Sequence, residues 1–204
     1  MLTSGLGETT DLANSSIEQG LMNVNATPPT PDALVSSTLL QQSSQESMHT
    51  FTEDDYFNTL LTLAEWGDAK AQHNLGALFL EGIEIEQDYT EAFKWHSLAA
   101  EQGMAMAQHD LATLYLDGLG VDENPEKAAY WFAEAARQGD SKAQNNLGIL
   151  YATGHGVPLD LVQAYKWFTL AAEQGMLDAL ENRAMAEEEM SSAQLATARQ
   201  LLSQ

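Results

Sequence analysis

Apolar residues between positions 68 and 103 fall into two stripes, each spaced like one face of an α-helix. A glycine follows each stripe, and Gly103 can end the second helix because glycine adopts the left-handed conformation at low cost. Asp88, with Glu91 three residues later, is expected to cap the start of the second helix. The pattern predicts a helix–loop–helix unit whose stripes are Ala71, Leu75, Leu78 and Phe79, then Ala92, Trp95, His96 and Ala99.

The same unit returns every 36 residues. "KWHSLAAEQGM" begins at Lys94, "YWFAEAARQGD" at Tyr130 and "KWFTLAAEQGM" at Lys166. A fixed period of this size is typical of stacked repeat arrays, in which one unit cannot bury its apolar face alone. The small and aromatic residues at equivalent positions are Ala71, Ala107, Ala143 and Ala179; Trp95, Trp131 and Trp167; and Gly103, Gly139 and Gly175.

Partial units flank the array. Residues 52–67 align with a second helix alone and predict an N-terminal half-repeat cap, followed by repeats at 68–103, 104–139 and 140–175. Residues 176–204 predict a degenerate repeat and a C-terminal capping helix that starts at Ser191, where Gln194 completes a capping box. The predicted fold of 51–204 is therefore all-α, an α-solenoid of 36-residue helix-turn-helix repeats with about three full repeats plus capping helices.

Two stretches carry a family resemblance: "AQNNLGILYATGHGVPLDLVQAYKWFTLAAEQG" from Ala143 and "AQHDLATLYLDGLGVDENPEKAAYWFAEAARQG" from Ala107. Together they resemble the Sel-one-like repeat (SLR) family, and the resemblance covers about residues 64–180. It implies a right-handed α-solenoid related to tetratricopeptide repeats, with scaffolding and signalling roles, usually in bacteria for proteins this small.

The chain departs from that family's pattern in three ways. Glu84 stands where later units have Gly120 and Gly156, so the first loop is expected to be built differently. Ala112 replaces the helix glycine found elsewhere in the array. The chain has no cysteine, which excludes the cysteine-rich secreted branch of the family as well as disulfides, zinc thiolates and thiol catalysis.

Residues 1–50 have a different composition. They contain fifteen Ser or Thr, three Pro, no aromatic residue and no Lys or Arg. So few side chains able to bury surface predict a disordered N-terminal tail. Two apolar clusters, within 12–22 and 34–40, are either incidental or form a helix on binding. A Ser/Thr-rich tail without bases also suits a non-classical export signal.

The chain carries 30 acids and 8 bases, a net charge of −22. Such a surface repels phosphate backbones and anionic lipid, so nucleic-acid and membrane partners are not expected. The charge serves solubility or favours a basic protein or peptide. The sequence shows no secretory n-region and no apolar run long enough to span a bilayer, so a cytoplasmic location is expected, with non-classical secretion as the alternative.

Candidate chemistry is sparse. His73 and His109 occupy equivalent positions in successive repeats, which we call a column of the aligned repeats. Helices packed about 8–10 Å apart would bring the two imidazoles together only with strain. No third ligand recurs beside them, although a metal site needs three or four. His96 occupies a column filled by Phe132 and Phe168, so it is expected in the core. We therefore expect no metal, no cofactor and no catalytic residues, and interpret the glycine loops as turns and the acid pairs as solvated faces.

Outside the core stripes, a second row of residues follows the first helices, and we call it the groove row. The resemblance to tetratricopeptide solenoids implies that this row lies on a concave face. The row predicts a groove for a protein or peptide, unless capping segments or the tail cover it. The predicted function is a non-catalytic adaptor or scaffold, with a secreted bacterial effector and a hydrolase or metal-dependent enzyme as the alternatives. The groove row consists of Lys70, His73, Ala77, Leu80, Met106, His109, Thr113, Leu116, Lys142, Asn145, Ile149 and Ala152.

Overall fold

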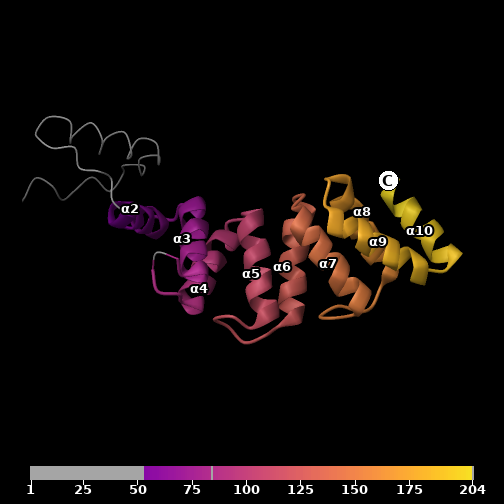
Figure 1. Ribbon diagram of the computed structural model, residues 1–204, viewed down its shortest axis with the longest axis horizontal. Coiled ribbons are helices and arrows are strands. Elements are labelled where there is room, and N and C mark those ends of the chain that lie inside the picture. The colour runs from indigo at the N-terminus through magenta and orange to yellow at the C-terminus, as the bar shows by residue number, and fades with distance from the viewer. Residues whose placement is uncertain (1–52, 84, 204) are drawn as a thin grey trace, which may run out of the picture. The chain divides into compact units, whose positions relative to one another are not determined.

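The computed structural model describes residues 53–83 and 85–203, and every regular element in those ranges is an α-helix (Figure 1). The predicted tail at 1–50 and Glu84 lie outside the described residues. The helices are α2 (Glu53–Glu65), α3 (Ala69–Glu81), α4 (Tyr89–Glu101), α5 (Ala105–Asp117), α6 (Pro125–Arg137), α7 (Ser141–Thr153), α8 (Leu161–Glu173), α9 (Leu177–Glu189) and α10 (Ser192–Leu202).

Consecutive helices pack side by side, which confirms the predicted array of helix pairs. Repeat 1 is α3 with α4, repeat 2 is α5 with α6, and repeat 3 is α7 with α8. Each second helix also packs on the first helix of the next unit, so one stack of contacts runs from α2 to α9. The chain then turns back, because α10 packs on α8.

Helix boundaries follow the predicted signals. Asp88 accepts hydrogen bonds from backbone N–H groups in the first turn of α4, as predicted, and Asn124 and Asp160 do the same for α6 and α8. Gly103 has a φ of 87°, the left-handed conformation expected for it. Ser191 and Gln194 form the predicted capping box at the start of α10.

The core is made mainly of alanine and leucine, with buried rings contributed by the second helices. The alanine column at 71, 107, 143 and 179 is buried throughout. In each second helix a ring lies against the first helix: Phe132 is 0% exposed and Phe168 is 2% exposed. A Cβ added to Gly148 would lie 2.5 Å from the Phe168 ring, so glycine leaves the room that this ring occupies.

A buried glutamine in each first helix joins neighbouring units, a contact that the sequence analysis did not foresee. The Gln108 side chain donates to the Ala100 carbonyl in the preceding second helix at 3.2 Å. Its own side-chain oxygen accepts from Gln138, at the end of the second helix of the same repeat, at 2.7 Å. Gln72 and Gln144 repeat both contacts, so each glutamine supplies a partner to a helix-end carbonyl at the seam between repeats.

The loops inside repeats 2 and 3 pack on the preceding repeat. A Cβ at Gly120 would meet the Tyr89 carbonyl oxygen, at the start of α4, at 2.0 Å. A Cβ at Gly156 would meet the Pro125 carbonyl oxygen, at the start of α6, at 2.3 Å. Glycine at these positions therefore permits both a positive φ and the close approach of two repeats.

Replacement of the central ring should be costly. Phe132→Ala is expected to lower the free energy of unfolding by about 3–5 kcal/mol, because it removes a fully buried ring between two helices. Tyr130→Ala is the matched control, since Tyr130 lies in the same helix and is 57% exposed. Urea unfolding followed by circular dichroism measures both; equal losses would contradict the assignment of Phe132 as the core ring.

The loop contact can be separated from backbone strain by comparing two glycines. Gly139 has a φ of 93° and no atom within 4 Å of an added Cβ, so Gly139→Ala should cost only the left-handed strain of about 1–2 kcal/mol. Gly156→Ala should cost about 1–3 kcal/mol more, because the added Cβ also forces repeat 3 away from repeat 2. Equal changes in the urea midpoint would show that the loop does not hold the repeats together.

Candidate functional site

The structure places the twelve residues of the predicted groove row in three environments. Lys70, Met106, Lys142 and Ile149 are exposed. The sequence predicts His73 and Asn145 on an open surface, but both are buried, at 8% and 5% exposure. The remaining six are half-buried: Ala77, Leu80, His109, Thr113, Leu116 and Ala152.

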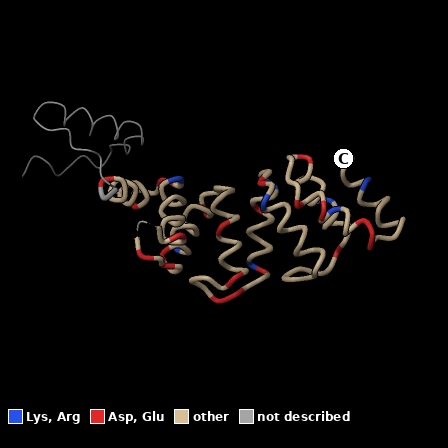
Figure 2. The backbone as a smooth tube through the Cα atoms, viewed as in Figure 1, with Lys and Arg blue, Asp and Glu red and all other residues tan. Residues whose placement is uncertain are grey.

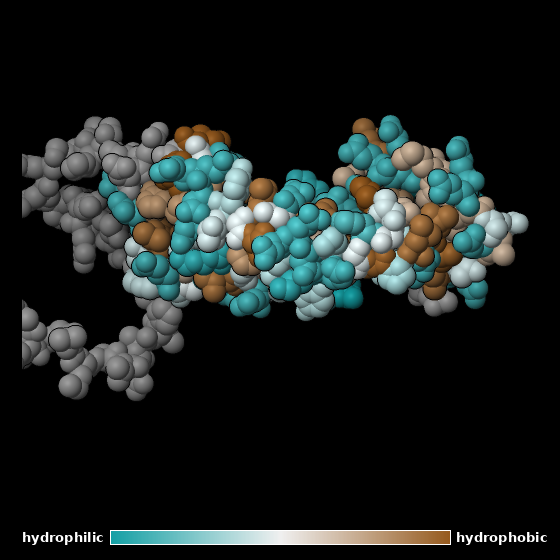
Figure 3. Space-filling view, turned by 90° about the horizontal axis from the view of Figure 1, so that it is seen from below, coloured by the Kyte–Doolittle hydropathy of each residue, from teal (hydrophilic) through white to brown (hydrophobic). Residues whose placement is uncertain are grey.

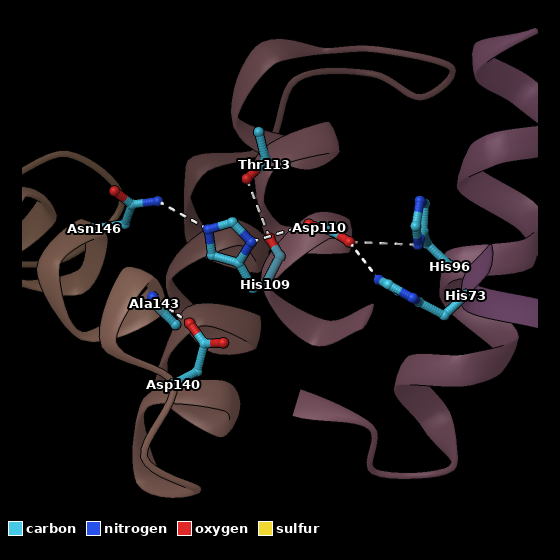
Figure 4. Close-up of polar contacts among 8 residues, drawn as sticks. All are labelled: His73, His96, His109, Asp110, Thr113, Asp140, Ala143 and Asn146. Atoms are coloured by element: carbon cyan, nitrogen blue, oxygen red, sulfur yellow. Dashed lines mark hydrogen bonds and ion pairs between the residues drawn. The ribbon is translucent and has the colours of Figure 1, made fainter. Parts of the chain in front are cut away.

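His73, His109 and Asn145 turn toward the next repeat, where each meets a polar side chain. His73 Nε2 lies 2.8 Å from Asp110 Oδ2, and Asn182 donates to Asn145 Oδ1 at 2.9 Å. The Asn146 amide lies 3.4 Å from His109 Nε2 (Figure 4). The pairs form a polar ladder along the first helices, α3 to α5, α5 to α7 and α7 to α9.

At the first step of this ladder His73 and Asp110 meet a third side chain, His96 of α4. His96 Nδ1 lies 3.9 Å from Asp110 Oδ2, and the two imidazole rings are 5.3 Å apart between centroids in an edge-to-face arrangement. Figure 4 shows the Asp110 carboxylate pointing at both rings, with His109 on its other side. We call His73, His96 and Asp110 the histidine–aspartate cluster.

Burial and hydrogen bonding shift the pKa values in this cluster. Burial lowers the pKa of His96 to about 4, although the Asp110 charge opposes the shift. The hydrogen bond to Asp110 raises the pKa of His73, against the effect of burial. Burial would raise the pKa of Asp110, but hydrogen bonds from His109 and His73 outweigh it and hold that pKa well below its usual range. At neutral pH the cluster therefore contains a neutral His96 beside an ionised Asp110.

His96 is fully buried, as expected for its column, but its polar atoms are not satisfied. Neither ring nitrogen has a hydrogen-bond partner among the described residues, and the same is true of His73 Nδ1. A Cβ at Gly76 would lie 2.9 Å from the His96 ring, so the imidazole takes the place that Phe168 takes over Gly148. A buried, unpartnered imidazole where other repeats have phenylalanine needs a physical reason.

Sequence reasoning compared His73 with His109 and missed Asp110. The available signal was the column of Asn74, Asp110, Asn146 and Asn182, in which Asp110 is the single acid. Two imidazoles and a carboxylate are the side chains in the described part of the chain that could hold a metal ion.

A second feature lies where repeat 3 meets α9. A pocket of about 380 Å³ opens between α7, α8 and α9, and its lining is mainly apolar. Two residues of the predicted row, Ile149 and Ala152, form one wall, and Met185 and Glu189 of α9 lie opposite. Met185 is 59% exposed and Ile149 39%, so apolar surface continues out of the pocket. From the sequence, the region of α9 is predicted only as a degenerate repeat that closes the array, without a binding role.

Apolar side chains also gather toward the C-terminal end of the array in the space-filling view (Figure 3). Leu177 and Leu180 of α9 are 73% and 39% exposed.

Of the helices in the described ranges, none combines the length and hydropathy that crossing a membrane requires.

The chain matches the Sel1 repeat at residues 69–104, 105–140 and 141–176. A comparison with curated proteins found no match.

Among solved structures, it is similar to a protective antigen present in uropathogenic Escherichia coli strains and displaying an SLR fold. The identity is 34% and the TM-score 0.70, over 84% of this chain and 37% of that one, so the chain spans little more than a third of the antigen. It is also similar to a Sel1 repeat protein from Oxalobacter formigenes, at 37% identity and a TM-score of 0.57, over 61% of this chain and 94% of that one. Cysteine rich protein B of Helicobacter pylori is 25% identical with a TM-score of 0.51, over 64% and 96% of the two chains.

The unsatisfied imidazole predicts a stabilising substitution. His96→Phe should raise the free energy of unfolding by about 1–3 kcal/mol in buffer containing EDTA, because it removes buried polar atoms and supplies the ring that α6 and α8 carry at this position. His155→Phe, in an exposed loop, is the control and should change stability little. A loss of stability in His96→Phe, measured by urea unfolding, would contradict this interpretation.

Proposed function

The chain belongs to the Sel1 repeat family, and from this premise we propose that it is a non-catalytic adaptor that binds a segment of a partner protein on its first helices and α9. Proteins of this family are generally interaction scaffolds and are typically non-catalytic.

The observation that carries the proposal is the pocket between α7, α8 and α9. Its floor includes Phe168, and its rim exposes Ile149 and Met185. Exposed apolar side chains around a concave apolar site favour the docking of a partner's apolar side chain. Methionine adapts its shape easily, which suits a rim that closes around such an anchor.

The polar groups of the pocket support binding over chemistry. Glu189 is the one ionisable residue in the lining, beside the neutral polar residues Thr153 and Asn182. A single carboxylate at a rim can pair with a cation or accept a hydrogen bond, but it does not provide the paired acid and base that hydrolysis commonly uses. An apolar anchor with a basic or amide group nearby is therefore the partner chemistry that fits.

Charge supports the same class of partner. Red acidic positions outnumber blue basic ones along the backbone tube (Figure 2), and the chain carries a net charge of −22. This field would attract a basic segment and repel nucleic acid and anionic lipid. Of the residues in the predicted row, Met106 is exposed and Leu80 half-buried, so apolar side chains are also available in repeats 1 and 2.

A photo-crosslinking amino acid at position 149 or 185 tests the proposal in the native cell, with position 98 in α4 as the comparison. Leu98 is 38% exposed, nearly the same exposed fraction as Ile149 at 39%, and it is not part of the pocket lining. We expect one partner segment to be cross-linked from positions 149 and 185 and not from 98. The peptide identified by mass spectrometry then serves as the ligand for affinity measurements.

The double variant Ile149→Glu and Met185→Glu should weaken binding of that peptide at least about 10-fold, because it places two charges where an apolar anchor docks. Leu98→Glu with Ile83→Glu is the matched control, since both residues are exposed, belong to repeat 1 and are absent from the pocket lining. Equal affinity of the two double variants, with equal helicity, would place the binding surface elsewhere.

A further inference from the structure

Comparison of equivalent positions in the repeats shows two departures, one in repeat 1 and one in repeat 2. At the ring position of the second helix, α6 has Phe132 and α8 has Phe168, whereas α4 has His96. In the column of Asn74, Asn146 and Asn182, α5 has Asp110. Both departures introduce metal-ligating side chains, and the structure brings them together with His73. Neither departure is required by the fold, because the same fold is built from phenylalanine and asparagine in the other repeats.

We propose that His73, His96 and Asp110 form a binding site for a first-row divalent metal ion such as Zn²⁺. The ligand atoms of the three side chains all lie within 4.8 Å of one another. His73 Nε2 is 2.8 Å from Asp110 Oδ2, and His96 Nδ1 is 3.9 Å from the same oxygen. Zinc holds such atoms at about 2.0–2.2 Å, which places ligands about 3.3 Å apart in a tetrahedral site. Small side-chain adjustments therefore suffice to admit an ion.

The unpartnered nitrogens of His96 are the second observation. The His96 side chain is 0% exposed and has no hydrogen-bond partner among the described residues, yet its Nδ1 points toward the Asp110 carboxylate. A metal ion between them would give Nδ1 the partner that it lacks. It would also explain why an imidazole stands at a buried position where the other repeats have phenylalanine.

His109 orients the carboxylate from outside the cluster. Its Nδ1 lies 3.0 Å from Asp110 Oδ1, and its Nε2 faces the Asn146 amide at 3.4 Å. Because the amide can only donate through its nitrogen, His109 Nε2 accepts and Nδ1–H donates to Asp110. This leaves Oδ2 directed at His73 and His96, as outer hydrogen bonds orient ligands in known metal sites.

The donor set selects the class of ion. Two imidazoles with one carboxylate suit zinc, copper, nickel or cobalt, whereas magnesium and calcium prefer oxygen ligands alone. Three protein ligands leave one position for water, which can reach the site because the Asp110 side chain is 30% exposed. The ligands come from α3, α4 and α5, so a bound ion would join repeat 1 to repeat 2.

The test uses the full chain, freed of metal with EDTA and dialysed, and titrated with Zn²⁺ in a calorimeter. We expect one saturable site per chain, a higher melting temperature with Zn²⁺, and no such effect with Mg²⁺. His96→Phe and Asp110→Asn should each weaken Zn²⁺ binding about 100-fold or more, since each removes a ligand. Both substitutions insert the side chain that the other repeats carry, so both variants should stay folded without metal.

His155→Asn is the control, because this histidine is exposed in a loop outside the cluster. It should bind Zn²⁺ as the unmodified chain does, with the same shift in melting temperature. Zn²⁺ binding that survives in both His96→Phe and Asp110→Asn would assign the ion to surface acids and overturn the proposal. The absence of saturable Zn²⁺ binding to the unmodified chain would overturn it as well.

Discussion

Each repeat depends on a ring in its second helix that lies over a small residue in its first. The ring can reach this depth only where the facing residue has little or no side chain: a Cβ at Gly148 would come within 2.5 Å of Phe168, and one at Gly76 within 2.9 Å of His96. In repeat 2 Ala112 takes the facing position, and it shares one buried cluster with Phe132. Close packing of this kind explains why the same few columns recur with the 36-residue period.

Contacts between repeats depend on different residues. The loop glycines Gly120 and Gly156 rest on the first carbonyls of the preceding second helices, and the buried glutamines satisfy carbonyls at the ends of those helices. These contacts fix how one repeat sits on the next. The polar ladder joins neighbouring first helices, so a change of residue type at one position meets a defined neighbour in the next repeat.

Two separate opportunities for function follow from this arrangement. At the first step of the ladder, Asp110 and His96 replace an amide and a phenyl ring and meet His73. At the other end, α9 keeps the alanine contact of a first helix through Ala179, but has Met185 and Glu189 where it faces α7 and α8. The degenerate unit therefore closes the core while it leaves an apolar pocket open. Neither feature needs the other, because one lies in repeats 1 and 2 and the other in repeat 3 and α9.

The sequence by itself determined the helices, their caps, the period and the buried stripes, because these depend on residues within about one turn of each other or on exact repetition of a column. It indicated the surface row only in part, since His73 and Asn145 are buried. The tertiary structure alone decided which columns meet. Side chains of the ladder pair across 37 residues, one more than the period, as in His73 with Asp110 and Asn145 with Asn182. Neighbouring first helices therefore touch through residues that differ by one position in the repeat. Aligning the repeats pairs His73 with His109, whereas in the folded chain His73 contacts Asp110 and His96.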